Sequence, residues 1–147
     1  AISSARVVRL FGFDPKVAFV SHSTFGQPLT SRTKHIKNAV EILKQKSVDF
    51  EFDGDMQPDV ALNEEYKTLY PFSKLVGNAN ILVMPGQHSA AISYKMMKTL
   101  GDTKVIGPLL IGLGLPIEIA PLRSSTSEIL NLASIAAYSA DVIDYKK

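Results

Sequence analysis

The chain has 147 residues, of which 46% are hydrophobic, 20% are charged and 8% are aromatic, and it contains no cysteine. This length and apolar content suffice for one domain with a sizeable core, and they exclude a largely disordered chain. The lack of cysteine excludes a disulfide framework and favours a reducing compartment, so a cytoplasmic location is expected. The formal net charge of +2 gives no reason to expect nucleic acid or an anionic membrane as a partner. No apolar run reaches the roughly 20 residues that a membrane-spanning helix needs.

Short apolar runs alternate with longer amphipathic segments along the first half of the chain. Helices are predicted over Ile2 to Phe11 and over Ser31 to Lys46, where apolar residues recur at spacings of three and four. Strands are predicted at Lys16 to Ser21, a compact apolar run, and at Asp49 to Asp53, whose alternation suits an edge strand. One or two short helical turns are expected between Pro58 and Leu69.

The second half of the chain continues this alternation. Asn80 to Pro85 is the clearest buried strand, and His88 to Leu100 is predicted as a helix. Lys104 to Leu113 and Pro116 to Ala120 are predicted as two further strands, and Ser125 to Ala140 as a final helix. Strands that alternate with helices of this length predict an α/β fold, a three-layer α/β/α arrangement around a mostly parallel sheet.

This architecture places the candidate binding loops at one edge of the sheet. In open parallel sheets, ligands bind beyond the carboxyl ends of the strands, where loops lead into helix N-termini. Four loops qualify, which span residues 21–30, 53–59, 85–89 and 107–116. If the strands are parallel, these loops share one rim.

The loop after the first strand, Ser21-His22-Ser23-Thr24-Phe25-Gly26, carries the most chemistry. Backbone N–H groups and hydroxyls at such a turn suit a phosphate, and Arg32 and Lys34 can add positive charge. The alternative is a plain polar loop in which Thr30 or Ser31 caps the following helix. The Gly-Lys-Ser/Thr ending of a nucleoside-triphosphate loop is missing, so triphosphatase chemistry is not expected.

Acidic and histidine side chains offer weaker candidates for a metal or acid–base site. The segment from Asp53 to Asp59 lacks the glycine of a calcium loop. A Mg²⁺ site and an acid–base carboxylate remain alternatives to the commoner case of solvated turn acids and helix caps. His22, His35 and His88 show no spacing typical of a metal site. A structural role is expected for His22 and His88, and a solvated position for His35.

Two motifs near the end of the chain are interpreted as structural. Gly112-Leu113-Gly114 lacks the third glycine of a dinucleotide fingerprint and is expected to form a turn. Ser124 or Ser125 can cap the last helix, with Glu128 completing a capping box.

Five motifs occur in a fixed order and together span most of the chain. They are Ser21 to Gly26, Asp53 to Leu62, Tyr70 to Leu75, Asn78 to Pro85 and Ile106 to Leu113. This series resembles the C-terminal half of the phosphate acetyl/butyryltransferase family. Within that family it is most similar to the phosphotransacetylase-like domain fused behind the catalytic part of large bacterial NADP-dependent malic enzymes. Phe25 stands where true phosphotransacetylases usually carry lysine in the Ser-x-Ser-Thr-x-Gly loop.

The resemblance implies how the chain is organised. It implies a partial isocitrate/isopropylmalate-dehydrogenase-like fold, in which residues 1–147 form the C-terminal part of a phosphotransacetylase-like domain. A start at Ala1 without methionine agrees with a piece of a larger protein. The decarboxylation of malate to pyruvate and CO₂, with its NADP and Mg²⁺ or Mn²⁺, would then belong to an upstream region.

For this chain the resemblance implies a regulatory and oligomerisation domain that binds acetyl-CoA or another phosphate-bearing small molecule and forms homo-oligomers. The implied ligand-binding residues are Ser21, Ser23, Thr24 and Gly26, with Asp53, Gln57 and Asn80 at the same rim, and Glu128 in the place of a family acid.

The resemblance also bears on catalysis. Counting back from Ile129, Pro121 and Leu122 occupy the positions of the Ser-Arg pair of true phosphotransacetylases. Neither side chain can donate a hydrogen bond or balance a phosphate's charge, so no catalytic residue is assigned. One alternative is an active phosphate acyltransferase that uses Arg123 in a shifted register. Another is a purely structural dimerisation domain.

Overall fold

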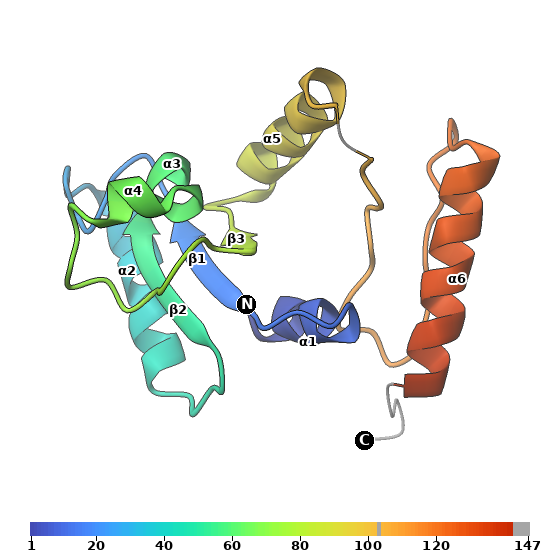
Figure 1. Cartoon of the computed structure of the whole chain (residues 1–147), viewed down its shortest axis with the longest axis horizontal. Coiled ribbons are helices and arrows are strands. Elements are labelled where there is room, and N and C mark those ends of the chain that lie inside the picture. The colour runs from blue at the N-terminus through green and yellow to red at the C-terminus, as the bar shows by residue number, and fades with distance from the viewer. Residues whose placement is uncertain (103, 143–147) are drawn as a thin grey trace. The chain divides into compact units, whose positions relative to one another are not determined.

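The computed structural model describes residues 1–102 and 104–142, which divide into two compact units (Figure 1). The first unit is Ala1–Tyr94 and the second begins at Lys95, so the division falls within one helix. The first unit contains, in chain order, α1 (Ile2–Leu10), β1 (Lys16–Val20), α2 (Ser31–Lys44), β2 (Glu51–Met56), α3 (Pro58–Leu62), α4 (Glu64–Lys67), β3 (Ile81–Val83) and the start of α5 (Gln87–Leu100).

The first unit is built on a parallel sheet of three strands. Their order is β2-β1-β3, so β1 lies in the middle and pairs with both neighbours. From Val17 to Val20, every residue of β1 is at most 7% exposed. A strand buried on both faces has a continuous apolar sequence, and this pattern predicts β1 from the sequence. The predicted α/β class, the parallel pairing and the edge position of β2 are confirmed.

Helices cover both faces of this sheet. On one face, Val17 and Phe19 of β1 pack with apolar residues of α1 and α2, namely Ala5, Val40 and Leu43. On the other face, Ala18 and Val20 pack with Met56 of β2 and with Val60 and Ala61 of α3. Each such burial stabilises the fold by about 1.5–3 kcal/mol for a side chain of valine size or larger. The first unit therefore has the expected three layers.

The edge strand β2 differs from its prediction. It runs over Glu51–Met56, whereas the alternating pattern predicted a strand over Asp49 to Asp53. Its two inner acids, Asp53 and Asp55, are only 7% and 2% exposed. The prediction of solvated turn acids is therefore wrong for both, because each carboxylate accepts hydrogen bonds from residues far away in the sequence.

The two strands predicted over Lys104 to Leu113 and Pro116 to Ala120 are not formed. Residues 104–125 carry no helix or strand, and α6 (Thr126–Val142) follows them. A strand needs a neighbour to pair with, and no segment within 1–102 or 104–142 pairs with these two runs. Both predictions are therefore wrong in the structure. No helix in the part of the chain that the structure describes is long and apolar enough to cross a membrane.

The start of α6 carries the capping box that the sequence predicts. The Ser125 N–H donates to the Glu128 carboxylate at 2.8 Å, and the Glu128 N–H donates to the Ser125 hydroxyl at 3.3 Å. Lys98 of α5 also donates to Glu128 at 2.8 Å within this second unit. Glu128 therefore satisfies a free N–H group at the helix start and joins α5 to α6.

These contacts predict a pH-dependent role for Glu128. The hydrogen bond from Lys98, followed by those from Ser125, lowers the pKa of Glu128 from 4.5 to about 2. A lowered carboxylate pKa stabilises the fold above the unfolded value of 4.5, and that stabilisation is lost as the pH falls through about 2. We expect Glu128→Gln to lower the melting temperature of the second unit at neutral pH, with a difference from the native chain that shrinks toward pH 2. Circular dichroism melts at several pH values measure this, with Asp102→Asn as a control. A difference that stays constant with pH would contradict the role.

Candidate functional site

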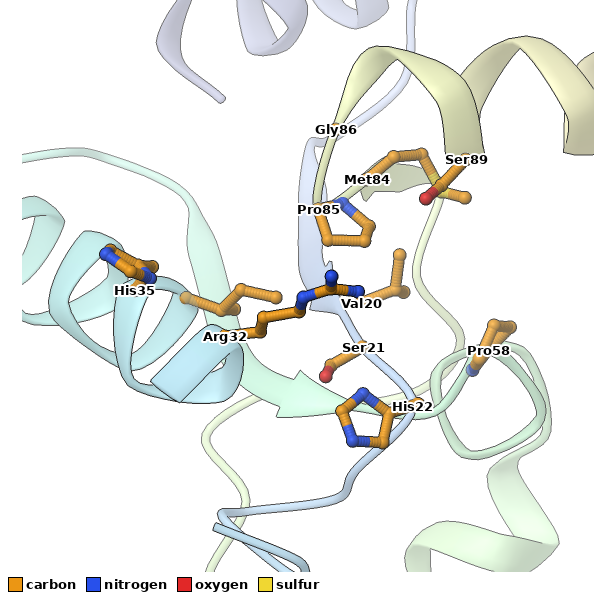
Figure 2. Close-up of a pocket in the computed structure, with 11 residues that line it drawn as sticks. Val20, Ser21, His22, Arg32, His35, Pro58, Met84, Pro85, Gly86 and Ser89 are labelled. Carbon is orange, nitrogen blue, oxygen red and sulfur yellow. The ribbon is translucent and has the colours of Figure 1, made fainter. Parts of the chain in front are cut away.

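A pocket of about 640 Å³ opens at the carboxyl end of the sheet in the first unit (Figure 2). Because β1 lies between β2 and β3, the chain leaves β1 toward one neighbour and later returns to the other side. Ligands bind at such switch points in open parallel sheets. The lining residues end or follow β1, follow β3, or belong to the adjoining helices. They are Val20, Ser21, His22, Arg32, His35, Ile36, Pro58, Met84, Pro85, Gly86 and Ser89.

The polar lining of this pocket suits an anion. Arg32, in the first turn of α2, extends over the carboxyl end of β1 toward Val20 (Figure 2). Its guanidinium makes no hydrogen bond or ion pair with any residue of 1–102 or 104–142, so its donors are available to a ligand. None of the lining residues is acidic, while His22 and His35 supply further N–H donors. The N-terminus of α2 adds partial positive charge.

Of the predicted phosphate-loop residues, Ser21 lines the pocket, while Ser23 and Thr24 point inward. Ser23 is fully buried, and its hydroxyl donates to the Asp55 carboxylate. The Thr24 hydroxyl accepts the N–H of Gln57 at 3.2 Å. The Gln57 amide in turn donates to the His22 carbonyl at 3.2 Å. These bonds tie the loop to the end of β2 and fix the position of Ser21.

Gly26 shapes the loop. Thr24 and Gln27 exchange backbone hydrogen bonds of 3.2 and 3.1 Å around a two-residue turn. Its central residues, Phe25 and Gly26, have φ angles of 49° and 82°, the signs that a type I′ turn requires. The Phe25 ring packs against Tyr70 and Phe72, with ring centroids 5.5 and 4.8 Å away. Phe25 therefore belongs to an aromatic cluster and adds no charge to the loop.

The other predicted site residues lie elsewhere. The Asp53 carboxylate accepts the Lys74 N–H at 2.7 Å and the Ser73 hydroxyl at 3.0 Å, which fixes the 73–75 turn against β2.

The structure does not bring Asn80 to the rim. Asn80 directly precedes β3, at the amino end of the sheet, where its side chain accepts the Lys16 N–H at 2.8 Å and donates to the Asp14 carbonyl at 2.7 Å. Glu128 belongs to the second unit and caps α6.

The histidines differ in their outcome. His35 is exposed, as predicted, and it lines the pocket together with His22, for which a structural role was expected. His88 is not among the lining residues. The spacing of Arg32 and His35 was the available signal, since residues three apart on a helix lie on the same face. Within residues 1–102 and 104–142, no three His, Asp or Glu side chains gather as a metal site would need.

Known proteins similar to this chain include malic enzymes and phosphate acetyltransferases. The NADP-dependent malic enzyme of Rhizobium meliloti (strain 1021) is 48% identical over 140 residues, which are 95% of this chain and 18% of that protein. The phosphate acetyltransferase of Clostridium acetobutylicum is 37% identical over 142 residues, 95% of this chain and 43% of that protein. A phosphotransacetylase structure from Streptococcus pyogenes matches with a TM-score of 0.89 at 34% identity, covering 95% of this chain and 43% of that one. The chain thus spans less than half the length of each.

Residues 1–137 match the phosphate acetyl/butaryl transferase family, which is nearly the whole chain. The match agrees with the order of the five sequence motifs and with the parallel sheet. The resemblance drawn from the sequence is confirmed: this chain belongs to the phosphate acetyl/butaryl transferase family.

Proposed function

We propose that this chain is the C-terminal part of a phosphotransacetylase-like domain of an NADP-dependent malic enzyme. In this proposal it binds acetyl-CoA, or another phosphate-bearing small molecule, without transferring an acyl group. The observation that carries the proposal is the pocket at the switch point, which has the N-terminus of α2 and no acidic lining residue. It also holds the Arg32 guanidinium, which has no partner among residues 1–102 and 104–142.

The lack of transfer chemistry is supported by the segment before α6. By the ungapped count from Ile129, Pro121 and Leu122 stand at the positions of the Ser-Arg pair that the resemblance implies, and Leu122 is fully exposed. Neither residue offers a hydrogen-bond donor or a positive charge to an acyl phosphate in the transition state. A binding pocket without these groups is expected to sense a ligand and leave it unchanged.

Within this proposal, Ser21 contacts the ligand directly, while Ser23, Thr24, Gly26 and Gln57 hold the loop in position. NADP and Mg²⁺ or Mn²⁺ would be bound elsewhere in the whole enzyme. Residues 1–102 and 104–142 contain no group of three metal-ligating side chains. The sequence also lacks a complete dinucleotide fingerprint, so neither the metal ion nor NADP is expected to bind here. The complete protein is proposed to be a cytoplasmic homo-oligomer that decarboxylates malate, with this domain in an isocitrate-dehydrogenase-like fold.

An assay of acetyl phosphate formation from acetyl-CoA and phosphate tests whether the chain transfers an acetyl group. We expect the purified chain to give no turnover above a blank without protein. Enzymes commonly turn over at about 1–10³ s⁻¹, and a rate in that range would overturn this half of the proposal. The same protein preparation must also be shown to bind acetyl-CoA. This control distinguishes an unfolded chain from a folded chain that lacks acyltransferase activity.

An active acyltransferase is the second candidate, favoured by the 37% identity to a phosphate acetyltransferase. It requires Arg123, two residues after Pro121, to act in a shifted register. If turnover is found, Arg123→Ala distinguishes the mechanisms, because activity that survives this change cannot depend on Arg123.

A further inference from the structure

Two serine side chains connect the floor of the pocket to the Asp55 carboxylate buried behind it. Ser21, Ser23 and Asp55 are 7%, 0% and 2% exposed. The hydroxyl oxygens of Ser21 and Ser23 lie 3.4 Å apart, and the Ser23 hydroxyl donates to the Asp55 carboxylate. Figure 2 shows the Ser21 side chain in this view between Arg32 and His22, on the pocket side of the chain. The buried carboxylate is thus linked to the group that a ligand would meet.

An irregularity in the sheet places Asp55 in this position. Phe19 pairs with Gly54 and Val20 with Met56, so Asp55 is an extra residue in β2 that has no partner in β1. Such bulges redirect a side chain and are common beside functional sites. The bulge brings the Asp55 carboxylate to Ser23, which lies just beyond the end of β1.

The buried carboxylate fixes the direction of the hydrogen bonds. An ionised carboxylate only accepts, so the single proton of the Ser23 hydroxyl is given to Asp55. In the bond between the two serines, the proton must therefore come from Ser21. The Ser21 oxygen also accepts the Ser23 N–H at 3.3 Å. One lone pair of the Ser21 hydroxyl oxygen therefore remains to accept a hydrogen bond from a ligand in the pocket.

We propose that Asp55 is a positioning residue that makes Ser21 a hydrogen-bond acceptor toward the ligand, so that the pocket selects hydrogen phosphate over sulfate. The two anions have similar size and shape, and Arg32 can bind either. At neutral pH inorganic phosphate keeps at least one P–OH group, which can donate to the Ser21 lone pair, whereas sulfate has no proton to give. This inference rests on the proposed function, because it needs an oxyanion in this pocket.

Calorimetric titrations of the chain with inorganic phosphate and with sulfate at pH 7 and constant ionic strength test the inference. We expect the Kd for phosphate to be lower by a factor of about 10 or more, because a polar group left unpaired in a binding site costs affinity. Asp55→Asn offers an amide that can donate to Ser23 and reverse the chain of bonds. In that variant the preference for phosphate should disappear, with tighter binding of sulfate.

Asp53→Asn is the matched control, because it neutralises a buried carboxylate of the same strand that is not hydrogen-bonded to Ser23. It should keep the preference for phosphate. If Asp55→Asn does not fold by circular dichroism, Ser21→Ala takes its place and should bind both anions about equally through Arg32. Equal binding of phosphate and sulfate by the native chain would overturn this inference alone. Binding of neither anion at millimolar concentrations would overturn the proposed pocket function and this inference with it.

Discussion

Replacing Gly54 by alanine is expected to destabilise the first unit by roughly 2–5 kcal/mol. Gly54 has a φ of 148°, a backbone conformation that residues with a side chain rarely adopt. A Cβ at this position would lie 2.6 Å from the Phe19 carbonyl oxygen and 2.8 Å from the Phe19 Cβ. The central strand cannot move away without disturbing the cores on both of its faces. Because domains are stable by only about 5–15 kcal/mol, this change would leave the unit marginal.

Urea unfolding followed by circular dichroism measures this loss. Gly86→Ala is the matched control in the same unit, because Gly86 has no positive φ and nothing lies within 4 Å of the added Cβ. We expect the control to change the free energy of unfolding by no more than about 0.5 kcal/mol. Similar free energies of unfolding for the two variants would show that the tight bulge at Gly54 is not a feature of the folded chain.

Replacing Arg32 by glutamine is expected to weaken the binding of phosphate and acetyl-CoA by roughly 10- to 100-fold. The guanidinium is the one fixed positive side-chain charge among the residues that line the pocket, and a neutral amide cannot replace charge-assisted hydrogen bonds to an oxyanion. The fold should not change, because Arg32 is exposed and makes no bond within residues 1–102 and 104–142.

Lys34→Gln provides the control for Arg32→Gln. Lys34 lies in the same turn of α2 and its replacement changes the net charge equally, but Lys34 does not line the pocket. We expect little loss of affinity at physiological salt, because exposed charges are screened over about 8 Å. An equal loss in both variants would mean that the chain attracts anions by general charge and not through contact with Arg32.

Much of the fold could be predicted from the sequence because its signals are local. The apolar run of β1 and the helical spacing of α2 require only neighbouring residues to be recognised. The end of β2 could not be predicted, because Asp53 and Asp55 are acidic residues, which usually lie in solvent. They are buried here because the Asp53 carboxylate accepts a hydrogen bond from Ser73 and the Asp55 carboxylate accepts one from Ser23. The runs predicted as strands between residues 104 and 120 failed for a related reason, because pairing depends on a partner strand.

The candidate site was predictable in its location and less so in its detail. The rule for parallel sheets led to the loop after β1, and Ser21 and Arg32 both line the pocket there. Composition does not show which hydroxyls face inward, so it does not distinguish Ser23 and Thr24 from Ser21. The prediction that Asn80 lies at the rim was wrong, because Asn80 precedes β3 and therefore lies at the amino end of the sheet.

The central claim is that this chain binds a phosphate-bearing ligand in the pocket at the carboxyl end of the sheet. Isothermal titration calorimetry of the purified chain with acetyl-CoA tests it most directly. We predict a saturable heat in the native chain that is strongly reduced in Arg32→Gln. The absence of heat at millimolar acetyl-CoA from a folded chain would contradict the claim and favour a purely structural dimerisation domain.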